Sequence, residues 1–432
     1  MKPIAWLGAA KVMACSVAGI LAVSACSTSP GSAGPAARAA TPAASTSPIS
    51  ATGRPTSTMG AGTFGTAGIP IPARGGTLNV YAYDGPGQLR GAAATARPLV
   101  YVPSTLSNTL QVIDPSTYEV IARYRTGGEP QHVVPSFDLR TLWVNDNAGN
   151  DLIPIDPQTG RPGPKVKVDD PYNLYFTPDG SHALVMAERL GRIDVRDPHT
   201  MRLQRRLPVP CKGLNHADYS ADLSFFLVTC EFSGQLLVID RDASTVLKVI
   251  DLNRAHVPGL ASDRAAAHIR GPQPGLPVGV RAMPQDVRLT PDGTRFVVAD
   301  MLRGGVWVID ARTTTVQRFI PTGKGAHSVY PDRNGRRLFV ANRDAGSITV
   351  LDANLNKTAL WNLPRGGSPD MGGVSADGRT LWLSGRYNGA VYVIDTTSGK
   401  LLKTIHVDPG PHGLCVWPQP GRFSLGHTGN MR

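Results

Sequence analysis

The sequence is poor in charged and aromatic residues. Only 18% of its 432 residues are charged and 6% are aromatic, whereas 41% are hydrophobic. A mostly disordered chain would carry more charge and fewer apolar residues, so this chain is expected to fold around a large core. Glycine and proline are plentiful instead, at 47 and 37 residues. This composition disfavours a helix bundle and favours many short strands joined by tight turns, which predicts an all-β protein.

Long basic runs and the familiar catalytic motifs are also missing. The formal net charge is +12, but no run of five or more Lys/Arg occurs, so we expect a solvated basic surface and no nucleic-acid binding. There is no Gly-x-Ser-x-Gly, His-Glu-x-x-His, Walker loop or Cys-x-x-Cys-His motif. The classes left are a binding scaffold and an enzyme whose catalytic groups converge from several parts of the chain.

The first 76 residues are predicted to contain an export signal and a flexible tether. Lys2 and Lys11 precede an apolar stretch over residues 12–23, which is too short to span a bilayer and is typical of an export signal. It ends in Val23-Ser24-Ala25-Cys26, which resembles the lipobox of bacterial lipoproteins. We therefore predict a signal peptide over residues 1–25, lipidation of Cys26, and a flexible Ser/Thr/Pro/Ala/Gly tether over residues 26–76.

A signal peptide and a lipidated cysteine imply that the protein lies outside the cytoplasm, anchored by lipid to the bacterial cell membrane. A plain secretory signal with an incidental cysteine is the alternative.

A repeat of about 42 residues fills the rest of the chain. Each period has a strand that ends in Ile/Val/Leu-Asp or a close variant, and the marker aspartates are 42, 41, 43, 70, 42 and 43 residues apart. The seven markers are Asp114, Asp156, Asp197, Asp240, Asp310, Asp352 and Asp395. Four short strands in each period describe a propeller blade. Residues 77–432 are thus expected to form a seven-bladed β-propeller of four-stranded antiparallel blades.

Several strands of the repeat resemble the YVTN-repeat family of seven-bladed propellers. Its relatives here include Leu338-Phe339-Val340-Ala341-Asn342 and Phe296-Val297-Val298-Ala299-Asp300. The resemblance covers about residues 99–428 and implies the fold. The larger superfamily includes lactone hydrolases, nitrous oxide reductase and cytochrome d1-type propellers, so the resemblance does not select one function.

The two ends of the repeat region complement each other. Residues 412–417 form an innermost strand with no third and fourth strands after it, while the first repeat begins at Leu99 without an innermost strand. We predict that joining them closes the ring. Residues 78–83 are predicted as an extra edge strand and residues 422–430 as a surplus copy of a second strand, neither of which the repeat places.

Polar residues gather where each innermost strand begins, at one face of the disc. Aligning the repeats gives two residues per blade at this mouth, and four of the ten histidines fall among them. The first residues are Gln131, Tyr172, Asn215, Gln285, His327, Asp370 and His412, and the next are His132, Asn173, His216, Asp286, Ser328, Met371 and Gly413. The turns between second and third strands add Asp146, Asn147, Glu188, Arg189, Glu231, Asp300, Asn342, Arg343, Arg386 and Tyr387.

This mouth is the predicted ligand site, with an acidic arc facing an arginine-bearing arc. Fifteen of these residues are predicted to bind the ligand: the seven first residues named above, with His132, Asn173, His216, Asp286, Glu188, Arg189, Arg343 and Arg386. The alternative is that channel mouths are wet and polar without binding anything. If the protein is an enzyme, we expect a lactonase-like hydrolase with His216 and Asp286 as catalytic candidates. No cofactor is predicted. A metal ion held by His132, His216, His327 and His412 is the alternative, although a seven-fold ring spreads its ligands widely.

The insertion and the cysteines complete the expectations. Residues 254–279, an insertion in the fourth blade that carries His256 and His268, are expected as a passive surface loop, with a lid over the mouth as the alternative. We expect Cys211 and Cys230 to form a disulfide and Cys415 to be a buried free thiol.

The combined prediction is a monomeric, lipid-anchored scaffold that binds a small ligand or a cell-envelope protein or polymer through its polar face.

Overall fold

A computed structural model describes residues 73–74, 77–260, 279–427 and 429–432 of the chain. The predicted signal peptide and most of the tether lie outside these residues, as does the greater part of the insertion, including His268. Within the described residues, no helix has the length and apolarity needed to cross a bilayer. The helical turns described there are η1 (Gly91–Thr95) and η2 (Leu252–Arg254).

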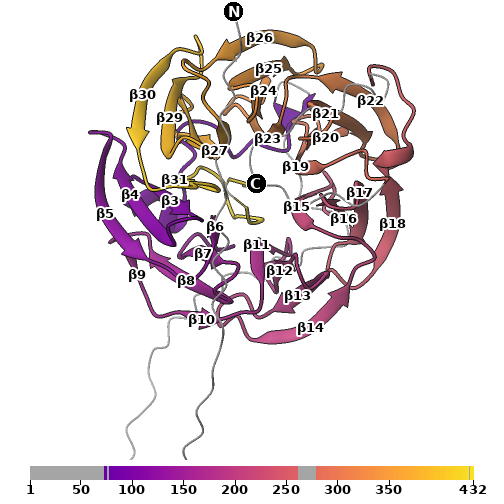
Figure 1. The fold of residues 1–432 in the computed structure, drawn as a ribbon. Coiled ribbons are helices and arrows are strands. Elements are labelled where there is room, and N and C mark those ends of the chain that lie inside the picture. The colour runs from indigo at the N-terminus through magenta and orange to yellow at the C-terminus, as the bar shows by residue number, and fades with distance from the viewer. Residues whose placement is uncertain (1–72, 75–76, 261–278, 428) are drawn as a thin grey trace, which may run out of the picture. The chain divides into compact units, whose positions relative to one another are not determined.

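Seven four-stranded antiparallel sheets stand around a centre like the blades of a propeller (Figure 1). The innermost strands of blades 1 to 7 are β31 (Cys415–Trp417), β6 (Pro130–Pro135), β11 (Pro171–Phe176), β15 (Leu214–Tyr219), β19 (Pro284–Leu289), β23 (Ala326–Pro331) and β27 (Pro369–Val374). The second strands are β3 (Leu99–Ser104), β7 (Leu142–Asp146), β12 (Ala183–Ala187), β16 (Phe225–Cys230), β20 (Arg295–Asp300), β24 (Arg337–Asn342) and β28 (Thr380–Gly385).

The outer half of each blade continues in the same antiparallel order. The third strands are β4 (Thr109–Asp114), β8 (Asp151–Asp156), β13 (Arg192–Arg196), β17 (Gln235–Asp240), β21 (Gly305–Asp310), β25 (Ser347–Asp352) and β29 (Ala390–Asp395). The outermost strands are β5 (Glu119–Arg125), β14 (Leu203–Pro208), β18 (Val246–Asp251), β22 (Val316–Pro321), β26 (Lys357–Asn362) and β30 (Leu401–His406). In blade 2 this strand is divided into β9 (Arg161–Pro162) and β10 (Val166–Lys167), which both pair with β8.

Burial falls from the centre outwards, and the sequence pattern follows it. Every residue of β6 is buried, whereas the outermost strand β14 alternates between half-buried and exposed positions. Apolar side chains pack between neighbouring blades, as Phe296 and Trp307 of blade 5 do against Leu227 and Leu236 of blade 4. Because a blade buries its two faces only against its neighbours, the ring is needed to complete each core.

The hairpins between the first two strands of the blades contain the tight turns that the glycine and proline content favours. Gly180, Gly293 and Gly378 each have a φ near +70°, which a glycine adopts without steric cost. In the first of these turns the hydroxyl of Thr177 donates to Asp179 at 2.6 Å. The sequence Thr-Pro-Asp-Gly forms this turn at both residues 177–180 and residues 290–293, because each blade needs the same hairpin at this point.

Ring closure is also confirmed. β31 pairs antiparallel with β3, with Trp417 opposite Leu99 and Cys415 opposite Tyr101. Blade 1 therefore takes its innermost strand from the end of the repeat region and its other three strands from the beginning (Figure 1).

The two segments that the repeat left over are not blade strands. In residues 78–83, only Leu78 is in a strand: β2 (Thr77–Leu78) pairs with β1 (Ala73–Arg74), and a turn follows. That turn docks on blade 5, where the hydroxyl of Tyr81 donates to the carbonyl of Leu289 at 2.8 Å. The prediction of an edge strand was wrong because a buried tyrosine docks this segment by its side chain.

Residues 422–430 likewise are no second-strand copy. The described part of this segment enters the centre of the ring, where the amide of Phe176 donates to the carbonyl of Leu425 at 3.0 Å and the amide of His427 donates to the carbonyl of Leu174 at 3.0 Å. Gly426 forms an isolated bridge with Tyr175. The segment thus uses backbone groups of β11 that face the channel.

Candidate functional site

The mouth residues owe their position to a repeated irregularity of the innermost strands. In a regular strand, successive side chains point to opposite faces, and a β-bulge changes that alternation and re-aims a side chain. Six of the seven innermost strands shift register near their start. The shifts lie between Pro130/His132, Pro171/Asn173, Leu214/Ala217, Pro284/Val287, Ala326/Ser328 and Pro369/Gly372.

A pocket of about 340 Å³ opens at this mouth. Nine of the fifteen predicted ligand-binding residues line it: Gln131, Tyr172, Glu188, Arg189, Gln285, His327, Arg343, Arg386 and His412. The other six, which are His132, Asn173, Asn215, His216, Asp286 and Asp370, are fully buried and do not line the pocket. Alignment of the repeats therefore placed these residues at one end of the channel but did not separate the wall of the pocket from the layer beneath it.

Asn147 and Glu231, which were expected at the mouth from their turns, also line the pocket. Four lining residues were not among any of the expected mouth positions. They are Glu129, Phe232, Met283 and Met301. Phe232 directly follows Glu231 in the turn between β16 and β17, so a longer window on the same turns would have found it. Glu129 directly precedes β6 and has a φ of +52°. Non-glycine residues rarely adopt this conformation, so nothing in the sequence indicated it.

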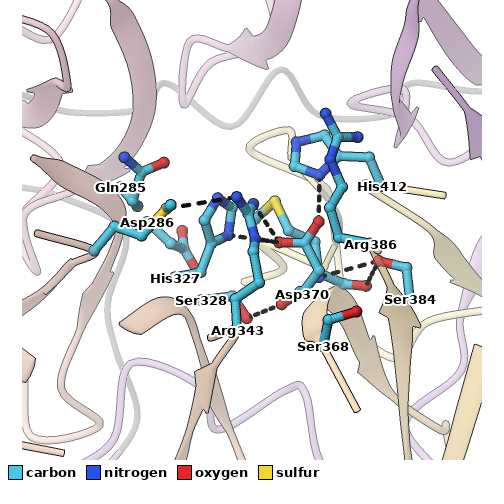
Figure 2. Close-up of polar contacts among 12 residues, drawn as sticks. Gln285, Asp286, His327, Ser328, Arg343, Ser368, Asp370, Ser384, Arg386 and His412 are labelled. Atoms are coloured by element: carbon cyan, nitrogen blue, oxygen red, sulfur yellow. Dashed lines mark hydrogen bonds and ion pairs between the residues drawn. The ribbon is translucent and has the colours of Figure 1, made fainter. Parts of the chain in front are cut away.

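A buried carboxylate, Asp370, organises the wall formed by blades 6 and 7 (Figure 2). Arg343 donates to Asp370 Oδ1 from Nε at 2.9 Å and from Nη2 at 2.5 Å. His412 Nδ1 lies 2.7 Å from Asp370 Oδ2, and His327 Nδ1 lies 3.0 Å from Oδ1. Burial alone would raise the pKa of Asp370, but Arg343 and the two histidines outweigh burial and hold this pKa well below its usual range.

Arg386 is the second guanidinium of this wall, and its surroundings differ. Its Nη1 donates to the hydroxyl of Thr105 at 3.1 Å and to the carbonyl of Gly410 at 3.3 Å. The residue is half-buried, and among the described residues no carboxylate lies within 4.0 Å of its guanidinium. Burial lowers its pKa; the charge of Asp370 opposes this shift and the charge of Arg343 adds to it. Arg386 therefore faces the pocket as a cation whose only described protein partners are neutral.

The wall across the ring carries two glutamates, from the turns of blades 3 and 4. Burial raises the pKa of Glu188 well above its usual value, and the neighbouring Glu231 raises it further. Burial also raises the pKa of Glu231, which accepts a hydrogen bond from Gln285 Nε2 at 2.8 Å. Arg189 is already engaged, because its Nε donates to Asp170 at 2.8 Å. Two carboxyl groups so close together favour sharing a proton at neutral pH.

The next layer down the channel is formed by imidazoles. His132, His216 and His427 are fully buried, with ring centroids 5.3 Å apart for the first pair and 4.5 Å apart for His216 and His427. Each of the three residues contributes one ring nitrogen to a group in which all three nitrogens lie within 4.8 Å of one another. His427 was not among the predicted site residues, because it lies outside the repeat.

The four histidines proposed from the sequence as metal ligands are thus divided between two layers. His132 and His216 meet His427, whereas His327 and His412 both turn Nδ1 towards Asp370. The two layers touch, since the rings of His132 and His412 lie 5.0 Å apart. All four histidines lie at the same end of the channel, as the repeat alignment predicted.

The cysteine pairing predicted from the sequence is present. Cys211, in the loop before β15, is joined by a disulfide to Cys230 at the end of β16, at the mouth face of blade 4. Cys415 is a buried free thiol, also as predicted, and burial raises its pKa well above the ordinary value.

Comparison with known proteins identifies the family. A sequence profile of the YNCE-like β-propeller family matches residues 86–207 and 318–420. No curated protein matches the chain.

Solved structures share the fold at low sequence identity. A functionally unknown protein from Desulfotomaculum acetoxidans is 14% identical, with a TM-score of 0.56, over 73% of this chain and 98% of its own. Dihydro-heme d1 dehydrogenase NirN, in complex with DHE, is 17% identical, with a TM-score of 0.51, over 76% of this chain and 77% of its own. Kuenenia stuttgartiensis hydrazine synthase is 16% identical, with a TM-score of 0.52, over 75% of this chain and 96% of its own.

Such low identities establish the architecture alone. The profile, in contrast, covers more than half of the residues. The chain therefore belongs to the YNCE-like β-propeller family.

Proposed function

We propose that this propeller is a lipid-anchored, extracytoplasmic binding protein whose mouth pocket holds a small polar ligand with an anionic group. The observation that carries the proposal is Arg386, a half-buried guanidinium in the pocket wall with only neutral hydrogen-bond partners among the described residues. A buried charge is costly unless it is paired, and a ligand anion supplies the missing partner.

The rest of the pocket sets the character of the ligand. Arg343 extends the positive wall but is already paired with Asp370, so Arg386 is the free anchor. Glu188, Glu231 and Gln285, across the ring, offer acceptors to a hydrogen-bond donor. A molecule with an anion at one end and an amine or hydroxyl at the other fits both walls, and a volume of about 340 Å³ suits a small molecule.

The proposed location rests on different residues. A lipobox-like sequence ends at Cys26, and a disulfide such as Cys211–Cys230 is typical of oxidising compartments outside the cytoplasm. Labelling cells with a radioactive fatty acid, with Cys26→Ser as the unlabelled control, tests the anchor.

The experiment on the ligand uses the purified mature protein and a panel of small carboxylates, amino acids and inorganic phosphate, with thermal shift followed by calorimetry. At least one probe is expected to bind, and Arg386→Met is expected to weaken that binding tenfold or more. Arg312→Met, which removes an exposed arginine outside the pocket, is the matched control. Absence of binding by every probe, or equal binding by the Arg386 variant, would refute the proposal.

A lactonase-like enzyme is the alternative that the sequence left open, with His216 and Asp286 as its candidates. Both residues are fully buried below the pocket and do not line it, so the geometry favours binding over catalysis. Lactone turnover that is lost in both His216→Ala and Asp286→Ala would reverse this preference.

A further inference from the structure

The imidazole layer beneath the pocket contains an unusual set of buried polar atoms without partners. His132 Nε2, both ring nitrogens of His216, His427 Nε2 and Asp286 Oδ1 are all buried and make no hydrogen bond. Each such atom has lost its hydrogen bonds to water without gaining a partner, which lowers the stability of the fold. Native proteins keep few of them, and several in one place indicate a missing water or ion.

The tautomer of His132 suits a metal ligand. Its Nδ1 lies 2.9 Å from the carbonyl oxygen of Tyr172, which can only accept, so Nδ1 donates its hydrogen there. The neutral ring then has a bare lone pair on Nε2. A histidine whose second nitrogen donates to a backbone carbonyl is the usual arrangement around bound metals.

Asp286 places a carboxylate beside this cluster. Its Oδ2 accepts from the amide of Val329 at 2.9 Å and lies 3.5 Å from Nη2 of the buried Arg288, which fixes the side chain and leaves Oδ1 without a hydrogen bond. Oδ1 lies 3.7 Å from His427 Nε2. Three imidazoles and one carboxylate oxygen are a donor set that zinc and related divalent ions prefer.

We propose that His132, His216, His427 and Asp286 form a binding site for one divalent transition-metal ion, with zinc as the best match. One cation would satisfy the orphan atoms that face it on all four side chains. The ligand nitrogens now lie within 4.8 Å of one another, whereas tetrahedral zinc with bonds of about 2.0–2.1 Å needs them about 3.3 Å apart. Loading therefore draws the ring nitrogens together by up to about 1.5 Å, and Asp286, which lies outside this group, moves in beside His427 as the fourth ligand.

The neighbouring histidines belong to a different arrangement. His327 and His412 turn Nδ1 to Asp370, which Arg343 already neutralises. Both oxygens of Asp370 are therefore occupied, whereas Arg288 contacts only Oδ2 of Asp286 and leaves its Oδ1, like the ring nitrogens of His216, without a hydrogen bond. This difference in free ligand atoms separates the metal site from the mouth pocket.

The site also gives the segment around His427 a role. This segment is held in the channel by backbone bonds to β11, and by Arg432, which donates to Asp218 at 2.7 Å. Its histidine adds the third imidazole. Metal binding is therefore coupled to docking of residues 422–432, because ligands from separate elements stabilise the folded arrangement when an ion joins them.

The proposal goes beyond the proposed function and does not depend on it. The first test is metal analysis of the full mature protein, purified without chelators, followed by chelator treatment and titration with Zn²⁺ or Co²⁺. About one equivalent is expected to bind, and bound Co²⁺ should give visible ligand-field absorption. His216→Gln and His427→Gln are expected to lose the bound metal and the Co²⁺ spectrum.

The control is His406→Gln, which replaces an exposed histidine on β30. It should bind one equivalent like the unaltered protein. If the folded, unaltered protein takes up neither ion, the layer holds water only and the proposal is wrong. Equal loss in the His406 variant would mean adventitious surface binding and would also overturn it. Anion binding at Arg386 is measured separately, so the two proposals can fail independently.

A second readout follows the segment itself. Zn²⁺ is expected to slow amide hydrogen exchange in residues 422–432 of the unaltered protein but not of Asp286→Asn or His216→Gln. Asp286→Asn keeps the shape of the side chain, so it tests the site where a histidine variant fails to fold. Unchanged exchange in the presence of Zn²⁺, in all proteins, would contradict the coupling.

Discussion

Replacing Asp370 by asparagine tests whether this carboxylate supports the pocket wall. The side chain is fully buried and balances the charge of Arg343, which is 6% exposed. Asparagine keeps the shape but removes the negative charge. It leaves a buried guanidinium whose partner is now a neutral amide, and it presents an amide where His327 and His412 now face a carboxylate.

The expected loss in the free energy of unfolding is about 3–5 kcal/mol, the usual cost of removing one partner of a buried ion pair. Most of that cost comes from the stranded positive charge and not from a lost attraction. Adding Arg343→Met to Asp370→Asn removes the stranded charge, so the double variant should be as stable as the single variant or more stable.

Equilibrium urea unfolding at pH 7 of the unaltered chain, both single variants and the double variant measures these quantities. The reasoning would be refuted if Asp370→Asn cost less than about 1 kcal/mol, or if the double variant lost the sum of the single losses. Additivity would mean that the two side chains do not interact despite their 2.5 Å contact.

Three further predictions concern stability. A Cβ on Gly372 would lie 1.8 Å from a backbone carbonyl oxygen of the neighbouring strand, so Gly372→Ala should cost at least about 2 kcal/mol in thermal or urea unfolding, whereas Gly373→Ala, with its nearest atom at 3.9 Å, should cost much less. The Cys211→Ser/Cys230→Ser variant should lose about 3 kcal/mol, because the disulfide closes a loop between residues 19 apart, and reductant should have no effect on that variant. Burial, with a neighbouring carboxyl, raises the pKa of Asp146 from 3.8 to about 8, so the proton that folding retains there is stabilising at low pH and its contribution is lost as pH rises towards 8. Asp146→Asn should therefore gain stability relative to the unaltered protein between pH 4 and pH 8, and a difference that stayed constant with pH would contradict this assignment.

The fold was predictable because its information is local and repeated. Turns such as residues 177–180, 290–293 and 375–378 recur at the same point of the repeat. One blade structure accounts for all of these turns. Seven weak signals in register carry more weight than one strong motif. The unpaired strands at the two ends then required closure, and β31 beside β3 provides it.

The site was predictable only where it follows the repeat. Aligned positions such as His327 and Arg386 line the pocket because every blade presents the same two points to the mouth. The depth of each residue along the channel was not predictable, because bulges and side-chain packing decide whether a residue such as Asp286 lies on the pocket wall or below it. His427 gave no signal, because it reaches its neighbours through a segment that no periodicity describes.

The pairing of β31 with β3 also sets the order in which the chain can be finished. The strands of blade 1 that are synthesised first, β3, β4 and β5, wait for residues 415–417, more than 300 positions later, before their inner edge is covered. During that interval β3 presents free amide and carbonyl groups, which any other extended chain can pair with. The yield of correctly folded protein should therefore fall as protein concentration rises during refolding, and a peptide copying residues 412–417 should compete for the open edge.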